Sequence, residues 1–181
     1  KPLLVRYGIP ATFFLTAGYV GYEREFWWDE LERLLLCPVK LPKTLHLTIA
    51  GIPLEWEHGG AANYTEDDRQ RTCAWRAWEI APSARHQIYR SLWELLNPLA
   101  EGDRQTVLEE LRLWAGEEPA VRPTHRPLSL KEVCALADGE LIEIGAHTMT
   151  HPALSSLSLS AQWDEIQQSK ARLEMILKHP V

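Results

Sequence analysis

The sequence predicts an α/β fold in which two short strands belong to one parallel sheet and a mostly helical region separates them. Thr12–Leu15 and Leu141–Ile144 are apolar runs without polar alternation, a pattern typical of parallel strands covered on both faces. A helix is expected before each strand, as in β/α architectures. Residues 23–126 show helical spacing and a hairpin pattern instead, which indicates an insertion between the two parts of the sheet.

The first 22 residues are expected to form half of a βα unit. Lys1–Tyr7 reads as the last turns of a helix, and Gly8 is placed to cap its carboxyl end. Ile9 and Pro10 then lead into the strand Ala11–Leu15.

The inserted region, residues 23–126, is expected to contain three main helices. Apolar residues recur at helical spacing over Phe26–Leu36, Ser83–Leu96 and Asp103–Trp114. Pro38 and Pro42 stop the first of these helices, because proline lacks the backbone N–H that a helix interior needs.

A β-hairpin and a polar turn are also predicted in the insertion. Leu45–Ile49 and Ile52–Trp56 are strand-like and are joined by Ala50 and Gly51, which suits a two-residue hairpin turn. This hairpin should be separate from the parallel sheet. Residues 63–68 are expected to form a polar turn and a helix cap, and they contain the adjacent pair Asp67 and Asp68.

Two further helices are expected around the second strand. Ser129 is placed to cap Leu130–Ala137, and Ser158 or Ser160 to cap Ala161–Leu177. The inner face of the last helix is predicted to carry Ile166, Leu173, Ile176 and Leu177.

The composition indicates one ordinary globular domain with a sizeable core. The chain has 181 residues, a net charge of −6 and 45% hydrophobic residues. The mild acidity argues against a nucleic-acid partner, and no apolar run is long enough to span a membrane. Cys37, Cys73 and Cys134 are expected to be buried free thiols rather than members of a disulfide. The oligomeric state and the compartment, cytoplasm or cell envelope, stay open.

The main candidate site is a pair of histidines directly after the second strand. His147 and His151 are four residues apart, so on one helical turn both imidazoles would lie on the same face. Neutral imidazole is a common zinc ligand. Solvated surface histidines are the competing interpretation. The protease pattern H-E-x-x-H is absent, because Thr148 follows His147.

Residues 143–158 resemble the second motif of the polysaccharide deacetylase family, the chitin- and peptidoglycan-deacetylase-like enzymes. The following helix, with Glu165 and Ile166, also resembles the family. Residues 1–18 are similar to its first helix and second strand. The resemblance implies that His147 and His151 bind a catalytic divalent metal, zinc above all, with cobalt or another divalent ion as alternatives. It also implies an N-acetylated polysaccharide or oligosaccharide as substrate.

The resemblance implies a specific fold and domain arrangement. Residues 1–22 and 127–181 would be a partial distorted (β/α) barrel of the deacetylase type. Residues 23–126 would be a Trp-rich helical insertion with a β-hairpin, similar to insertions in deacetylases from bacterial surface-polysaccharide gene clusters. The implied activity is metal-dependent removal of N-acetyl or O-acetyl groups.

The family's catalytic base and third metal ligand do not match any residue of this sequence. In the family they are the two aspartates of a Thr-Phe-Asp-Asp motif, which would be expected upstream of Lys1. Asp67 and Asp68 lack a preceding apolar strand, so the role is not transferred to them. The family's Arg-x-Pro-Tyr segment and late histidine would follow Val181. The expectation is therefore a truncated, inactive fragment with no catalytic residue of its own.

Two other interpretations stay open. The chain is alternatively a non-catalytic glycan- or protein-binding module with a vestigial metal site, or a fragment without independent function. Should the chain act alone, Asp67, Asp68 and Glu143 are the first candidates for the base. No substrate-binding residue is assigned.

The scattered histidines and the tryptophans are given structural interpretations. His46, His58, His86 and His125 are expected at the surface or in turns, and residues 58–60 are expected to be a plain turn rather than a substrate loop. Core packing is favoured over sugar stacking for most of Trp27, Trp28, Trp75, Trp78, Trp93 and Trp114. Trp28 or Trp56 facing a cleft is the minority hypothesis.

Overall fold

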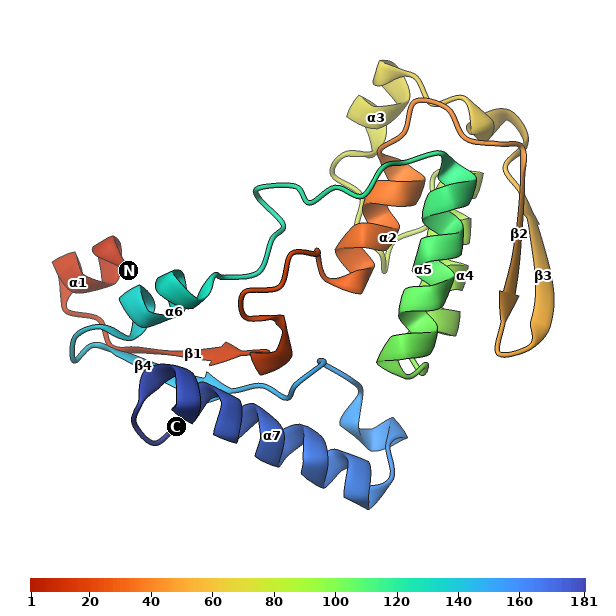
Figure 1. Cartoon of the computed structure of the whole chain (residues 1–181). Coiled ribbons are helices and arrows are strands. Elements are labelled where there is room, and N and C mark those ends of the chain that lie inside the picture. The colour runs from red at the N-terminus through yellow and green to blue at the C-terminus, as the bar shows by residue number, and fades with distance from the viewer. The chain divides into compact units, whose positions relative to one another are not determined.

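The computed structural model describes residues 1–181 and contains seven α-helices and two small sheets, without a closed barrel (Figure 1). The chain divides into two compact units. Unit 1 consists of Lys1–Arg24 and Arg126–Val181, and unit 2 consists of Glu25–His125. The mixed α/β class is as predicted, whereas the partial barrel is still a prediction. No helix combines the length and the apolar character needed to cross a bilayer.

Unit 1 is built on two parallel strands, β1 (Ala11–Leu15) and β4 (Ile142–Ala146). The register pairs Ala11 with Ile142 and Leu15 with Ala146, so both strands end at the same edge of the sheet. The prediction that these two segments share one parallel sheet is confirmed.

Three helices accompany this sheet: α1 (Pro2–Tyr7), α6 (Leu130–Ala137) and α7 (Leu159–Leu177). Gly8 adopts the left-handed conformation, with φ 63°, and caps α1 as predicted. Ser129 caps α6 through a reciprocal capping box with Glu132, and Ser158 caps α7. The unit's core joins Ile142 and Ile144 to side chains from all three helices.

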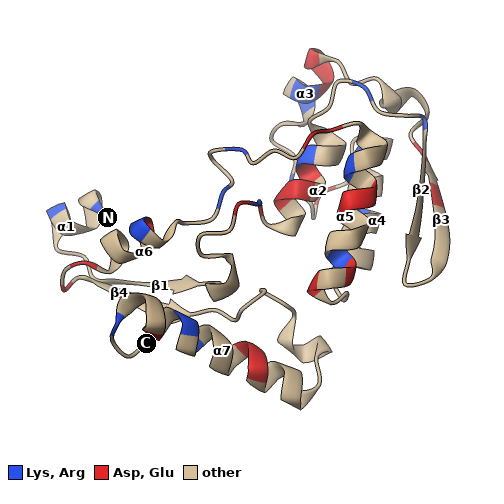
Figure 2. Cartoon of the chain, viewed as in Figure 1, with Lys and Arg blue, Asp and Glu red and all other residues tan.

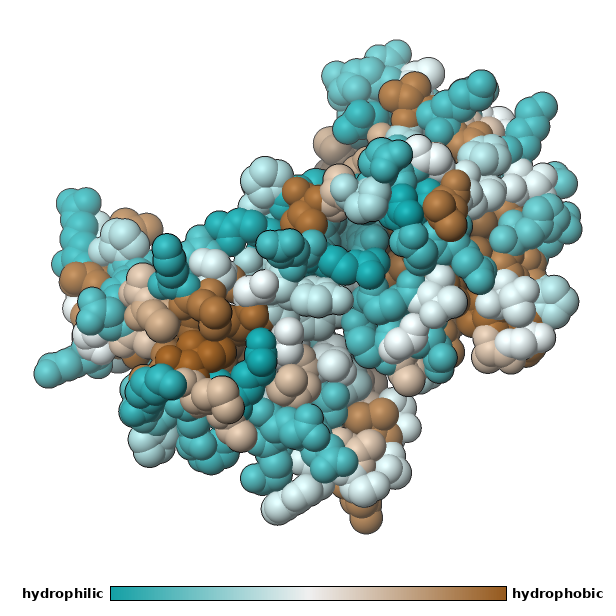
Figure 3. All heavy atoms as spheres, in the orientation of Figure 1, coloured by the Kyte–Doolittle hydropathy of each residue, from teal (hydrophilic) through white to brown (hydrophobic).

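The predicted coverage of both faces of these strands is wrong. Burial alternates along β1, with Phe14 65% exposed, because the core of the unit lies on only one face of the sheet. Figure 3 shows a group of apolar residues over the region of unit 1 that contains β1 and α6. Ile166 is 46% exposed rather than on the inner face of α7. Nineteen helical residues extend about 28 Å and five strand residues about 17 Å, so α7 reaches well past the sheet.

Unit 2 packs three helices against a hairpin, as the sequence predicts. The helices are α2 (Trp27–Leu36), α4 (Ala84–Leu96) and α5 (Glu101–Ala115), and a short helix α3 (Glu66–Thr72) begins at a capping box of Thr65 with Asp68. Acidic and basic residues are interleaved along α3 and α5 (Figure 2).

The hairpin of unit 2 pairs β2 (Thr44–Ile49) with β3 (Ile52–Glu57) and is separate from the sheet of unit 1. Ala50 and Gly51 connect the strands with φ values of 50° and 78°, the left-handed pair that twists a two-residue turn correctly. Its apolar face packs on a leucine-rich core that includes Leu31, Leu92 and Leu108, each fully buried.

The core interpretation holds for some tryptophans and fails for others. Trp27 is buried, and Trp28 and Trp114 pack against the same core. Trp78 is 80% exposed and Trp93 is 39% exposed, so the core interpretation is wrong for these two.

A buried cation organises one end of unit 2. Arg85 is fully buried and donates hydrogen bonds to five backbone carbonyls, those of Leu35, Pro38, Val39, Ala61 and Ala62. The guanidinium also lies over the ring of Tyr64, 4.7 Å from its centroid. This pattern gathers two stretches of the chain, residues 35–39 and 61–62, around one side chain, which no local sequence signal indicates.

Two histidines beside Arg85 are buried, so their predicted surface positions are wrong. His58 stacks on Trp114 with ring centroids 5.2 Å apart, and the Nδ1 of His86 lies 2.8 Å from the hydroxyl of Ser83. Burial, aided by the charge of Arg85, lowers the pKa of His58 and lowers that of His86 to about 4. His46 is exposed, as predicted.

The cysteines are free, but they are not buried. Cys73 and Cys134 are exposed and Cys37 is half-buried, so the predicted burial is wrong. Burial raises the pKa of the Cys37 thiol.

Candidate metal centre

The histidine pair lies at the carboxyl edge of the parallel sheet of unit 1. β4 ends at Ala146, and the backbone N–H of His147 donates to the carbonyl of Leu15, 2.9 Å away. The ladder therefore continues one residue beyond the strand before the chain turns. Ligand sites in parallel sheets are characteristically built beyond the carboxyl ends of the strands, which is where both histidines lie.

The two imidazole rings lie beside each other. The ring centroids of His147 and His151 are 4.8 Å apart, with an angle of 64° between the planes. Both residues are exposed.

The predicted helical turn between the histidines is wrong, because Thr148 and His151 have left-handed φ values of 62° and 59°. Two left-handed residues close a tight loop, so a loop rather than a helix brings the rings together.

The carboxylate of Glu165, in α7, forms hydrogen bonds with the loop between the two histidines. Its Oε2 accepts the backbone N–H groups of Met149, at 2.7 Å, and Thr150, at 3.0 Å, and its Oε1 accepts the hydroxyl of Thr150 at 2.9 Å. Hydrogen bonds to a carboxylate are stronger than neutral ones, so this residue fixes the backbone between the histidines. The family resemblance included Glu165 but gave it no role.

The backbone around Gly18, which follows β1, also forms hydrogen bonds with this loop. The N–H groups of Ala17 and Gly18 donate to the carbonyls of Thr148 and Met149, each at 3.0 Å. A Cβ at position 18 would lie 2.4 Å from the Met149 oxygen, so only glycine permits this approach. A glycine three residues after an apolar strand is the only sequence signal for this contact, and that signal is weak.

The side chain of Thr148 forms two hydrogen bonds within the loop. Its hydroxyl donates to the carbonyl of His147 at 2.6 Å and accepts the N–H of His151 at 3.1 Å. The positions of both histidine backbones therefore depend on one side chain between them.

The two imidazoles could supply two ligands to a metal ion. Imidazole nitrogens are ordinary ligands of zinc and similar ions. The chain contains no group of three or more His, Cys, Asp or Glu side chains that could hold an ion. A third protein ligand is therefore not supplied beside His147 and His151, and two ligands alone predict weak binding.

The other candidate carboxylates are engaged elsewhere. Glu143 faces the same side of β4 as His147, but four residues of strand separate them by about 13 Å. Glu143 instead accepts a hydrogen bond from Thr12 at 3.2 Å. Asp67 and Asp68 begin α3 in unit 2, where Asp68 caps the helix and pairs with Arg71. Hydrogen bonds from Thr65 lower the pKa of Asp68.

The two tryptophans considered for a cleft differ in the structure. Trp28 lines a pocket of unit 2, whereas Trp56 donates its indole N–H to Ser91 at 3.3 Å and packs against the core. His58 precedes a short 3₁₀ helix, Gly59–Ala62, which includes the other two residues of the predicted turn.

Comparison with known proteins agrees with the sequence resemblance over one part of the chain. Residues 120–181 match the family model described as polysaccharide deacetylase. No curated protein and no solved structure matches the chain. The matched segment contains α6, β4, α7 and both histidines, and it supports a relationship to the polysaccharide deacetylase family.

Proposed function

We propose that this chain is part of a metal-dependent hydrolase that removes N-acetyl or O-acetyl groups from a polysaccharide. The observation that carries the proposal is the histidine pair, with ring centroids 4.8 Å apart, inside the segment that matches the deacetylase family. The family supports a polysaccharide substrate, and the exposed position of the pair leaves room for one.

The residues of this site would bind the metal ion and fix the position of its ligands, and they would not act as the base or the acid. His147 and His151 would hold a divalent ion, and Glu165 would fix the loop that carries them. A bound zinc or cobalt ion would supply Lewis-acid polarisation of the acetyl carbonyl and of a water molecule. Hydrolysis also needs a base and an acid for the leaving group, and the family resemblance assigns neither role to a residue of this sequence.

The test is hydrolysis of an acetylated chito-oligosaccharide with zinc or cobalt. Residues 1–181 should release acetate negligibly, because loss of one member of a cooperating set removes most of the rate. A longer version that includes the flanking coding sequence should be active, and His147→Ala should reduce its turnover by roughly 100-fold or more. Comparable turnover by the two versions would place the base within residues 1–181, with Asp67, Asp68 and Glu143 the first to mutate.

A binding module with a vestigial metal site is the second candidate. The exposed indoles of Trp78 and Trp93 favour it, because exposed aromatic surface suits ligand binding. Zinc and glycan binding by the longer version, without any acetate release, would select this function over the hydrolase.

A further inference from the structure

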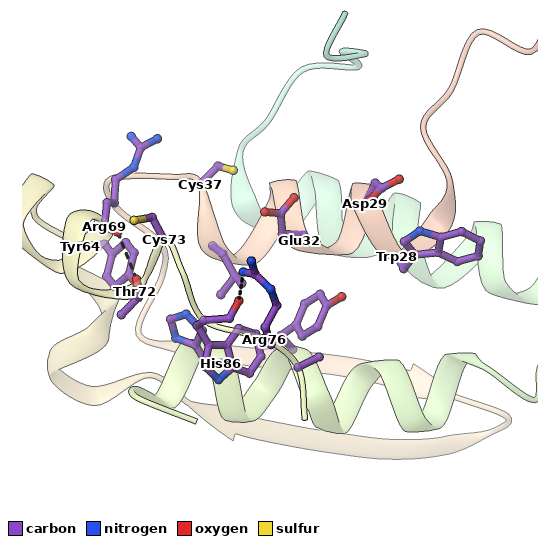
Figure 4. Close-up of a pocket in the computed structure, with 14 residues that line it drawn as sticks. Trp28, Asp29, Glu32, Cys37, Tyr64, Arg69, Thr72, Cys73, Arg76 and His86 are labelled. Carbon is purple, nitrogen blue, oxygen red and sulfur yellow. Dashed lines mark hydrogen bonds between the residues drawn. The ribbon is translucent and has the colours of Figure 1, made fainter. Parts of the chain in front are cut away.

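Unit 2 contains two hollows that share Ala77 and Tyr89. The larger has a volume of about 370 Å³ and lies among α2, α3, α4 and the loop after α3 (Figure 4). The smaller has a volume of about 270 Å³ and is lined by Trp78, Arg90, Trp93 and Glu94 besides the shared residues. The shared residues Ala77 and Tyr89 place the two hollows next to each other, and their volumes are of the order that small ligands occupy.

Aromatic side chains provide the apolar part of this surface. Trp78 and Trp93 are the exposed members, at 80% and 39%. Trp75 is held in place, because its ring meets Tyr89 edge-on at 6.0 Å and its indole N–H donates to the carbonyl of Ile80 at 3.2 Å. Exposed indoles are unfavourable in water and gain most when a ligand covers them.

Charged groups provide the polar part. Asp29 and Glu32 of α2 and Arg76 of the loop after α3 are among the residues that line the larger hollow (Figure 4). Arg122 donates to the backbone carbonyl of Asp29 at 2.8 Å and to the carboxylate of Glu32 at 2.7 Å, which fixes this part of the wall. The carboxylate of Asp29 lines the hollow, where burial raises its pKa.

We propose that these two hollows form a saccharide-binding groove. Trp78 and Trp93 would cover the C–H faces of successive sugar rings, while Asp29 and Glu32 would accept hydrogen bonds from sugar hydroxyls. A polyhydroxylated ligand with apolar ring faces satisfies both kinds of group, whereas a purely apolar ligand would offer no hydrogen-bond donor to the carboxylate of Asp29. The choice of an N-acetylated chain rests on the proposed function, and the need for a hydroxylated ring ligand rests on the groove itself.

The test measures binding of an N-acetylated chito-hexaose to the whole chain with a metal chelator present, by calorimetry and by tryptophan fluorescence. Trp78→Ala and Trp93→Ala should each weaken binding about 2- to 10-fold, the effect of losing one stacked aromatic face. Asp29→Asn should weaken it as well. Trp163→Ala is the matched control, because Trp163 is 64% exposed but belongs to unit 1.

The outcomes separate the groove from the proposed function. Binding that needs no metal and falls in the Trp78 and Trp93 variants supports the groove even when no acetate is released. Unchanged binding in both variants, an equal loss in Trp163→Ala, or no saccharide binding overturns it, even when the longer version is an active deacetylase. Trp78 is so exposed that its variant should keep the fold, and that variant decides the question should Trp93→Ala unfold.

Discussion

Unit 2 encloses its own core between three helices and a hairpin, whereas unit 1 packs its helices against one face of a two-stranded sheet. In unit 2, even buried charges have partners, as Arg85 shows. In unit 1, Phe14 and Thr12 face solvent, and the candidate metal pair is exposed at the sheet edge.

This difference leads us to expect that substitutions in unit 2 mainly change the stability of the fold, whereas substitutions around the histidine loop of unit 1 mainly change metal binding. Changes in the core of unit 2 should alter the free energy of unfolding, because many groups there depend on one another. Changes around the histidine loop of unit 1 should alter metal binding first, because a few hydrogen bonds determine its geometry. Nearly every tryptophan lies in unit 2, so tryptophan fluorescence reports on that unit separately.

The largest effect is expected from Arg85→Met in unit 2. The substitution leaves five carbonyls without their donor and should lower the free energy of unfolding by about 3–5 kcal/mol, as measured by urea denaturation and tryptophan fluorescence. Arg90→Met is the control on the same helix, because Arg90 donates to one exposed carbonyl, that of Glu79. Equal effects of the two substitutions would show that Arg85 does not organise the core.

Acid should destabilise unit 2 through its buried histidines. The pKa of His86 in the folded chain is lowered to about 4, so as the pH falls below about 6.5 the unfolded chain takes up a proton that the folded chain does not. Stability is therefore retained above that pH and decreases below it, by about 2 kcal/mol at pH 5 from His86 alone. Urea midpoints at several pH values measure this. A His86→Gln variant should have a flatter profile, and an equally steep one would contradict the assignment.

Gly18→Ala should impair metal binding in unit 1 with little effect on unit 2. The added methyl would lie 2.4 Å from the Met149 carbonyl oxygen, so the histidine loop has to move, and zinc affinity should fall roughly 10-fold or more by calorimetry. Gly60→Ala is the control, because nothing lies within 4 Å of a Cβ there. Unchanged affinity in Gly18→Ala would mean that the loop's position does not determine binding.

The smallest effect is expected at a helix cap. Ser129→Ala removes the hydroxyl that accepts the N–H of Glu132, and it should cost about 1 kcal/mol of helix stability. Faster hydrogen exchange of the α6 amides would measure this loss. Ser155→Ala, at an exposed position in the short 3₁₀ helix Leu154–Ser156 and outside α6, should change nothing. Equal exchange in both variants would contradict the capping role.

The sequence was informative where structure depends on local signals. Periodicity and caps located the helices that begin after Ser129 and Ser158, and the Ala50-Gly51 pair located the hairpin turn. It also located His147 and His151 beside each other, although for the wrong reason.

The features that the sequence did not predict depend on contacts between residues that are far apart in the chain. The left-handed conformations of Thr148 and His151 are stabilised by Glu165 and Gly18, which lie far away in the sequence. The burial of His58 and His86 likewise follows from their position beside Arg85 and the core of unit 2, not from their own neighbours in the chain.

The central claim is that His147 and His151 bind one divalent ion together. Its most direct test is a zinc titration of the whole chain followed by NMR of the imidazole nitrogens. The account predicts that the signals of both rings shift together with one weak dissociation constant, that His46 and the exposed His179 do not respond, and that His147→Ala abolishes the response of His151. Shifts of the two rings at different zinc concentrations, or of one ring alone, would contradict it.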